Sequence, residues 1–328
     1  MLCIEVLISL KKNRKLVMSK IDISIISPIY RAENCIDELV FQIKKEVSMI
    51  TDNYEIILVE DCGPDNSWDK IQKLCFNDKK IVGIKLSRNF GQHYAITAGL
   101  DQSVGEWVIV MDCDLQDRPD QINKLYNKAL EGFDIVQGRR ENRKDSLMKK
   151  FFSFVFYRVL AYLSGYSQDN TIANFGVYNR KVISGIVSMR EKIRFFPTMV
   201  AWVGFRKTSI EIEHSNRLDG NSSYSISKLF NLALDIILAF SDKPLRIIIK
   251  FGMLISLFSF IFLLYNSYKY YTGQIIVLGY TSLIISIWFL SGLIMLMLGV
   301  VGLYVGKTFE STKDRPIYLI DVKINGGD

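Results

Sequence analysis

Short apolar runs alternate with amphipathic, helix-like segments along the first half of the chain. The runs are rich in β-branched residues and nearly continuous in hydrophobicity, which is typical of strands buried on both faces. They are Ile21–Pro28, Tyr54–Asp61, Ile81–Ser87, Glu106–Asp112 and Phe133–Gly138. This alternation predicts βαβ units, and therefore an α/β fold in which helices cover both faces of a mostly parallel sheet.

The pattern changes toward the C-terminus, where long uncharged stretches replace the short runs. No charged residue occurs from Phe251 to Tyr268 or from Tyr270 to Gly306. A bilayer core needs about 20 apolar residues per helix, so these stretches predict two transmembrane helices with a turn near residues 270–276. A pair of buried core helices is the alternative, but the second stretch is too long for an ordinary soluble domain.

Basic residues mark the outer ends of this predicted hairpin. Those outside the spans are Lys243, Arg246, Lys250, Lys307, Lys313 and Arg315, and the one between them is Lys269. Because positive charge accumulates on the cytoplasmic side of membrane proteins, both chain ends are predicted to be cytoplasmic. Just upstream, apolar residues recur at steps of three and four within residues 225–242. This periodicity predicts an amphipathic helix that lies in the membrane interface or packs on the preceding domain.

The composition narrows the classes of partner. A formal net charge of +7 favours an anionic partner, for which a negative membrane surface is the nearest candidate. Nucleic acid is not indicated, because the sequence has no zinc spacing, helix-turn-helix signal or aromatic ribonucleoprotein motif.

The five cysteines form no CxxC pair and are predicted to be free thiols, and His93 and His214 are predicted to be structural. The apolar run of residues 1–20 precedes their basic run, the reverse of a secretory signal, so we interpret them as an extension and leave the start at Met1 or Met18 open.

Polar loops follow the first four predicted strands, at residues 28–33, 61–65, 87–91 and 112–117. Parallel strands end at one edge of a sheet, where ligands of such folds bind. The last loop holds Asp112 and Asp114, whose carboxylates can share one hard cation while nucleotide phosphates complete its shell. Turn formation explains a single aspartate better than this cluster. No glycine-rich phosphate-binding loop follows the first strand, so a nucleotide would have to be bound by other residues.

Several short motifs follow one another in a characteristic order. They are "SPIYRAE" (27–33), "VEDCGPDNSW" (59–68), "LSRNFGQ" (86–92), "MDCDLQD" (111–117), "GRR" (138–140), "NRLDGNSSYS" (216–225) and "RPIY" (315–318). As an ordered set they resemble the polyprenyl-phosphate glycosyltransferases of glycosyltransferase family 2, which include dolichol-phosphate mannose synthases and bacterial undecaprenyl-phosphate sugar transferases. The resemblance runs from about Ile23 to Ile320. It implies a GT-A fold, a nucleotide-sugar donor, a Mg²⁺ or Mn²⁺ ion and a lipid-phosphate acceptor.

The resemblance also assigns roles to residues of these motifs. Pro28, Tyr30 and Glu33 would line the nucleoside pocket, and Asp61 would read the base. Asp112, Asp114 and Gln116 would surround the metal, and the two aspartates are the predicted catalytic residues. Arg88 would face the donor or stabilise its own turn. For Pro28, Tyr30 and Asp61 the alternative is an ordinary strand-ending turn.

Arginines are the predicted phosphate ligands. Arg139, Arg140 and Arg143 follow the fifth strand and are predicted to capture the acceptor phosphate, with Arg217 near the donor diphosphate. Guanidinium groups stay charged and donate two parallel hydrogen bonds to phosphate. The alternative is a solvated basic loop that attracts anionic lipid.

Three positions depart from the family pattern. Asn174 stands where a carboxylate is common, Ser223 replaces a frequent lysine, and Leu303 replaces a glutamate near the end of the second span. The general base is therefore unassigned, with Asp114 and Asp169 as candidates. An acceptor phosphate is already an anion at neutral pH, which reduces the need for a base.

These observations predict a chain of five parts. They are an N-terminal extension (1–20), a GT-A catalytic domain (21–224), an amphipathic juxtamembrane helix (225–244), two transmembrane helices (245–306) and a cytoplasmic tail (307–328). The oligomeric state is not determined, and a homo-oligomer is left open.

The predicted function is inverting transfer of a sugar to undecaprenyl or another polyprenyl phosphate at the cytoplasmic face of the inner membrane, as a step in making cell-envelope polysaccharide. The donor is a nucleotide sugar, with uridine favoured over guanosine diphosphate. One alternative is a glycan-extending membrane glycosyltransferase, which usually has a downstream QxxRW segment and more spans. The other is a non-enzymatic membrane anchor, which would not need an intact "DCDLQD".

Overall fold

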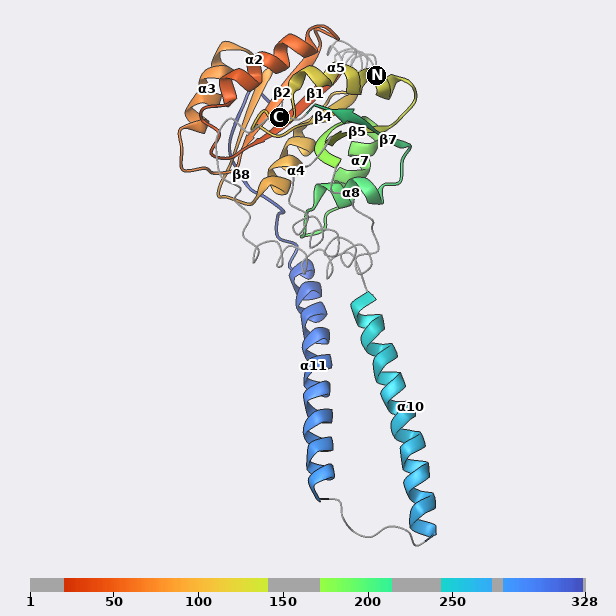
Figure 1. Ribbon diagram of the computed structural model, residues 1–328. Coiled ribbons are helices and arrows are strands. Elements are labelled where there is room, and N and C mark those ends of the chain that lie inside the picture. The colour runs from red at the N-terminus through yellow and green to blue at the C-terminus, as the bar shows by residue number, and fades with distance from the viewer. Residues whose placement is uncertain (1–20, 141–171, 214–242, 273–279, 327–328) are drawn as a thin grey trace, which may run out of the picture. The chain divides into compact units, whose positions relative to one another are not determined.

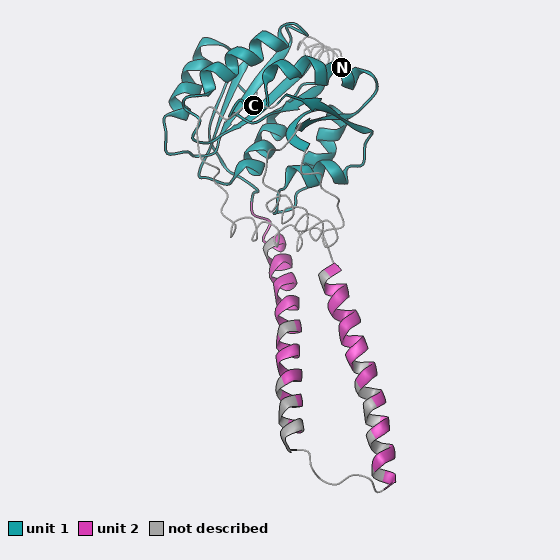
Figure 2. Cartoon of the chain, viewed as in Figure 1, with its two compact units in different colours: residues 1–146, 168–222, 316–328 teal, residues 147–167, 223–315 magenta. Residues whose placement is uncertain are grey.

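The computed structural model describes residues 21–140, 172–213, 243–272 and 280–326 of the chain. The chain divides into two compact units (Figure 2). The first contains residues 1–146, 168–222 and 316–328, and the second contains residues 147–167 and 223–315. The predicted juxtamembrane helix lies almost wholly outside the described residues, as do Arg143, Asp169, His214, Arg217 and Ser223.

An eight-stranded sheet forms the centre of the first unit (Figure 1). Its strands are β1 (Ile23–Ile29), β2 (Tyr54–Glu60), β3 (Ile81–Leu86), β4 (Trp107–Val110), β5 (Ile135–Arg140), β6 (Ile172–Asn179), β7 (Lys207–Ile212) and β8 (Ile320–Ile324). Their order is β7-β5-β6-β4-β1-β2-β3-β8. Within it, β6 is antiparallel to β4 and β5, and β8 is antiparallel to β3, while the other pairs are parallel. The five predicted strands and the mostly parallel α/β sheet are confirmed.

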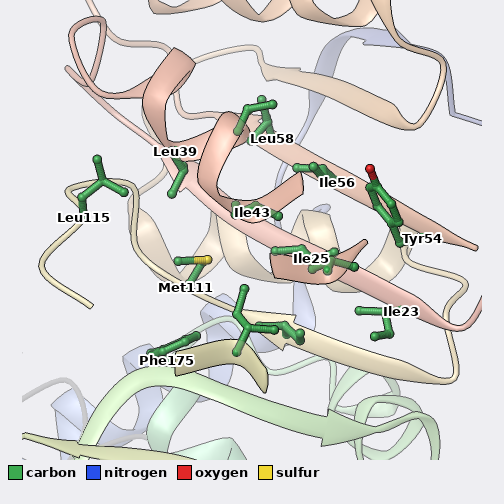
Figure 3. Packing of buried hydrophobic residues seen from close by; sticks show 14 of the residues in the cluster. Ile23, Ile25, Leu39, Ile43, Tyr54, Ile56, Leu58, Met111, Leu115 and Phe175 are labelled. Atoms are coloured by element: carbon green, nitrogen blue, oxygen red, sulfur yellow. The ribbon is translucent and has the colours of Figure 1, made fainter. Parts of the chain in front are cut away.

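Helices cover both faces of this sheet, as the alternating pattern predicts. One apolar cluster joins the sheet to α2 (Ile36–Val47), α3 (Ser67–Asn77) and α5 (Ile122–Leu130), which follows the short η1 (Pro119–Gln121). A second joins it to α4 (Gln92–Gln102), α7 (Arg180–Ser188) and α8 (Phe196–Trp202). Ile25 and Ile26 are neighbours on β1 but belong to different clusters, because successive side chains of a strand point to opposite faces. Figure 3 shows the first cluster.

The edge strand β8 was not predicted from the sequence. It follows the last helix of the second unit, and its partner β3 lies far back along the chain. Figure 1 shows this segment in blue beside the sheet. The end of the chain therefore belongs to the same folded unit as the first strands.

The second unit contains two long helices, α10 (Lys243–Tyr271) and α11 (Tyr280–Thr312). Apart from Thr272, the described residues of both predicted spans therefore lie in helices. Among the described residues, one stretch, Phe289–Phe309 of α11, is long and apolar enough to cross a membrane, with a mean hydropathy of 2.2. The two-helix membrane hairpin remains a prediction.

Candidate active site

The loops after β1, β2, β3 and β4 lie at the same edge of the sheet, because these strands are parallel. Each loop contains one residue with a positive φ angle: Arg31 (53°), Cys62 (49°), Gly91 (107°) and Leu115 (57°). A non-glycine residue in this conformation costs on the order of 1–3 kcal/mol, and such strain concentrates where a structure holds ligands. We call this edge the strand-end rim.

The turn after β4 brings together the three residues predicted to surround a metal. Met111 and Leu115 are buried in the first apolar cluster, so packing fixes the chain on both sides of Asp112 and Asp114 (Figure 3). Asp112 and Asp114 between them are partly exposed. The Gln92 side-chain amide donates to Oδ1 of Asp112 over 2.7 Å, and the backbone N–H of Gln116 donates to Oδ1 of Asp114 over 3.2 Å.

These two carboxylates are hard oxygen ligands held one residue apart, a donor set that suits Mg²⁺ or Mn²⁺. Among the described residues, no group of three or more His, Cys, Asp or Glu side chains could hold a metal ion by itself. Any cation at this turn would therefore need further oxygen ligands, for which phosphate is the natural source.

Asp61 lies at the rim but binds a loop of the protein. Its Oδ1 and Oδ2 accept hydrogen bonds from the backbone N–H groups of Phe90 and Gly91, both at 2.8 Å, and the residue is 2% exposed. Burial raises the pKa of Asp61, against the opposing effect of these two N–H groups and of Arg88. Because each carboxylate oxygen already has a partner, we interpret Asp61 as a residue that positions the loop between β3 and α4.

Sequence reasoning did not single out Glu60, the last residue of β2. It is 1% exposed, and its Oε1 accepts a hydrogen bond from the backbone N–H of Gly63. Its Oε2 is buried without a hydrogen-bond partner, as are Oγ of Ser27 and Oδ1 of Asp65. Burial is the main cause that raises the pKa of Glu60. Unpaired buried polar atoms are costly, so these three are candidate partners for a polar ligand at the strand-end rim.

Glu33 ties two loops of the rim together. Its carboxylate accepts hydrogen bonds from the Asn66 side chain at 3.2 and 3.3 Å and from the Asn66 backbone N–H at 3.3 Å. Its own N–H donates to Oδ2 of Asp65 over 3.1 Å. Pro28 is buried in β1, whereas Tyr30 is 43% exposed. The centroid of its ring lies 5.4 Å from Cζ of the Arg31 guanidinium. The exposed ring of Tyr30 is thus the part of this segment that can stack on a ligand.

Arg88, which was predicted to face the donor or stabilise its turn, and the described members of the predicted phosphate ligands also lie at strand ends. Arg88 is exposed after β3, with its guanidinium 4.2 Å from the ring centroid of Phe90. Arg139 is exposed, and it and Arg140 are the last residues of β5. Because β5 runs in the same direction as β4, both arginines lie at the edge that carries Asp112.

In the sheet register, Asn174 lies beside the turn after β4. The antiparallel ladder pairs Val110 with Gly176, and its continuation places Asn174 level with Asp112. The buried hydroxyl of Tyr178 donates to the backbone carbonyl of Asn174 over 3.4 Å. Burial raises the pKa of Tyr178, and the negative charge of Asp112 raises it further. The amide that replaces the family's carboxylate is therefore on the strand beside the predicted metal ligands.

His93 has the surroundings of a structural residue. Its ring contacts Phe195 edge-on, with the centroids 4.7 Å apart, and its Nδ1 is buried without a partner. Burial lowers the pKa of His93 to about 4. The described cysteines, Cys35, Cys62, Cys75 and Cys113, are free thiols as predicted.

Comparison with known proteins connects this geometry to a family. The glycosyl transferase family 2 model matches residues 24–186. An uncharacterized glycosyltransferase of Synechocystis sp. is 35% identical over 92% of this chain and 95% of its own length. An undecaprenyl-phosphate 4-deoxy-4-formamido-L-arabinose transferase of Yersinia pestis is 31% identical over 93% of this chain and 94% of its own length.

Comparison with solved structures agrees with the family match. Glucosyl-3-phosphoglycerate synthase of Mycobacterium tuberculosis, solved with Mn²⁺, uridine diphosphate and phosphoglyceric acid, superposes with a TM-score of 0.50 at 14% identity. The match covers 66% of this chain and 76% of that chain and shows a shared Rossmann-like GT-A architecture. The motifs, the strand-end rim and the relatives lead to one conclusion: this chain is a glycosyltransferase and belongs to glycosyltransferase family 2.

Proposed function

We propose that this enzyme transfers a sugar from a uridine diphosphate donor to undecaprenyl or another polyprenyl phosphate at the cytoplasmic face of the membrane. The observation that carries the proposal is the turn after β4, which presents Asp112 and Asp114 at the strand-end rim. The relative from Yersinia pestis, matched along nearly its whole length, is named for an undecaprenyl-phosphate sugar transfer. A lipid acceptor agrees with the apolar helix α11.

Asp112, Asp114 and Gln116 would hold a divalent cation together with the donor diphosphate. Such an ion neutralises the negative charge that develops on a departing diphosphate. The hydrogen bond from Gln92 to Asp112 and the buried anchors on either side of the turn hold these oxygen ligands in place before the donor arrives.

Glu60 supports a uridine donor. Its Oε1 already accepts the Gly63 N–H, whereas Oε2 is buried without a hydrogen-bond partner, so Oε2 is the oxygen most in need of a ligand donor. The edge of uracil carries a single N–H between two carbonyl oxygens, whereas guanine carries adjacent N–H donors that need both oxygens of a carboxylate. In this proposal Glu60 binds the uracil N–H while Tyr30 stacks on the base.

The acceptor phosphate is the nucleophile. One of its oxygens forms a bond to C1 of the sugar as the bond from C1 to the donor diphosphate breaks, with inversion at C1 and release of uridine diphosphate. Arg139 and Arg140 at the end of β5 would orient this phosphate through bidentate hydrogen bonds. Because the phosphate is already anionic, the presence of Asn174 in place of a carboxylate is compatible with the reaction.

Sheet connectivity supports the membrane hairpin. Strands β7 and β8 belong to the same sheet, so the chain between them crosses a membrane an even number of times or not at all. If α11 spans, a second crossing must precede it, and α10 is the described helix in position to supply it. Large apolar side chains of both helices are exposed in the chain, among them Phe258 (70%) and Met295 (74%), as expected for surfaces that face lipid.

The deciding experiment is a product analysis. Purified full-length enzyme in nanodiscs is incubated with Mg²⁺ or Mn²⁺, polyprenyl phosphate and a panel of uridine and guanosine diphosphate sugars, with Asp112→Asn as the inactive control. We expect a lipid-linked monosaccharide from a uridine diphosphate sugar. A growing glycan would favour the extension synthase, and no lipid-linked product from any donor would refute the proposal.

A further inference from the structure

The segment of residues 316–326, which follows α11, is bonded to the rest of the first unit at several points. We call residues 316–326 the C-terminal strap. It contains β8, which pairs with β3, and the carbonyl of Leu319 accepts a hydrogen bond from the N–H of Ser87 over 2.9 Å. Ser87 begins the rim loop that Asp61 holds through Phe90 and Gly91.

One side of the strap is bonded to the end of α4. The hydroxyl of Tyr318 donates to Oδ2 of Asp101 over 2.6 Å, and Nζ of Lys323 donates to Oε1 of Gln102 over 2.7 Å. Burial raises the pKa of Tyr318, and Asp101 raises it further, so the hydroxyl keeps its proton and can donate. Arg190, on the loop after α7, also binds Oδ2 of Asp101, at 3.0 Å.

The other end of the strap is bonded to α3 and to the start of β3. Asn325 has a φ of 62°, which asparagine tolerates, and its side-chain amide donates to the carbonyls of Cys75 at 2.5 Å and Ile81 at 3.0 Å. This contact holds the strap to the sheet without touching α4.

The helix α4 is a rigid connection between the strap and the site. Its first residue, Gln92, binds Asp112, and its last turn binds the strap. Between them the helix lies directly on β1 and β2: a Cβ added at Gly99 would come within 2.4 Å of Cγ2 of Ile26. Because tightly packed interiors transmit strain, we expect a change at Asp101 to reach Gln92 through this helix.

We propose that the C-terminal strap sets the position of the Asp112 carboxylate through α4, with Tyr318 and Gln92 as positioning residues at the two ends of that helix. The strap starts four residues after α11 ends at Thr312, so the chain segment leaving the apolar helix also controls the donor site. This inference rests on the proposed function only in placing the donor diphosphate at Asp112.

The test compares Tyr318→Phe with Asn325→Ala, a matched control on the same strap. Both variants should lose strap contacts and stability, but only Tyr318→Phe should loosen α4. We expect Tyr318→Phe to raise the donor KM and the Kd for uridine diphosphate about fivefold, with kcat within twofold of the parent, and Asn325→Ala to change neither constant. Gln92→Ala should weaken binding similarly, and the double variant Tyr318→Phe/Gln92→Ala should be no weaker than Gln92→Ala alone, because Tyr318 acts through Gln92.

A ligand-free measurement separates this inference from the proposed donor. Hydrogen exchange of the parent and Tyr318→Phe chains should show faster exchange in Tyr318→Phe along α4 as far as its first turn. If exchange changes only near Asp101, or if both strap variants alter donor affinity equally, the coupling is refuted. If the parent binds no uridine diphosphate, the proposed function fails, while the exchange result still decides the coupling.

Discussion

The side-chain amide of Gln92 donates a hydrogen bond to Oδ1 of Asp112 over 2.7 Å, and so joins the first turn of α4 to the turn after β4. Two motifs that are separate in the sequence, "LSRNFGQ" and "MDCDLQD", are thereby in direct contact. Because the amide fixes one carboxylate oxygen, the orientation of Asp112 is set by the protein before any ligand binds.

Neutralising either aspartate should abolish transfer without unfolding the protein. Asp112→Asn and Asp114→Asn keep the side-chain size but remove a charged metal ligand, so we expect a loss in kcat of at least about 100-fold. Turnover and thermal unfolding are measured together, with Asp120→Asn, whose partner Arg118 lies outside the turn, as the control. A chelator should reproduce the loss, and added Mg²⁺ or Mn²⁺ should reverse it. Unchanged turnover of both variants in chelator would refute the metal assignment.

Replacing Arg139 with lysine tests the acceptor site. Arg139→Lys keeps the charge but cannot form two parallel hydrogen bonds to phosphate, so the KM for polyprenyl phosphate should rise about tenfold while the donor KM is unchanged. Arg206→Lys is the matched control, since Arg206 precedes β7, at the opposite edge of the sheet. Equal kinetics for Arg139→Lys and the parent would place the phosphate contact elsewhere.

Glu60 and Glu55 lie on the same strand and allow a paired test of base recognition. Glu60→Gln should weaken uridine diphosphate binding by about tenfold or more, because the amide cannot accept the uracil N–H in the same way. Glu55→Gln should not, since the Glu55 carboxylate binds Ser24 at the other end of β2, with a distance of 2.6 Å to Oγ. Calorimetric titration with uridine and guanosine diphosphates measures both. Equal weakening in the two variants would contradict a specific role for Glu60.

The pKa of His93 predicts a loss of stability in acid. The folded pKa is about 4, below the ordinary value of 6.5, so the unfolded chain binds a proton first as the pH falls. Stability should decrease between pH 6.5 and 4 by up to about 1.4 kcal/mol per pH unit, with no further loss from this group below pH 4. Unfolding midpoints of the parent should therefore fall more steeply over this range than those of His93→Gln. Parallel pH profiles would show that His93 is not buried in its neutral form.

Membrane topology is tested with reporters after Asp328 and near Thr272. The pairing of β8 with β3 requires the C-terminus to lie on the same side as the catalytic domain, so the first reporter should be cytoplasmic. If α10 and α11 both span, the second should lie on the opposite face. A cytoplasmic signal at both positions would mean that neither helix crosses the bilayer.

Local pattern was enough to predict the five strands, the rim loops and the apolar C-terminal stretches. Near-continuous apolar runs with β-branched residues suit a buried parallel strand wherever they occur, and polar residues at their ends must follow the strands to one edge. The placement of Asp112, Asp114 and Gln116 on one turn follows from that logic alone.

Only the tertiary structure determined which residues contact one another across the fold. Glu60 and Asp61 are adjacent acidic residues, yet Asp61 binds the loop after β3 while Glu60 keeps a buried, unpaired oxygen, because consecutive positions at a strand end face opposite sides of the sheet. The strand β8 is short, and its partner lies far back in the sequence, so its pairing depends on an open sheet edge that exists only after the domain folds. The same holds for Tyr318 and Asp101, whose contact forms only when β8 at the edge of the sheet and α4 on its face are both in place.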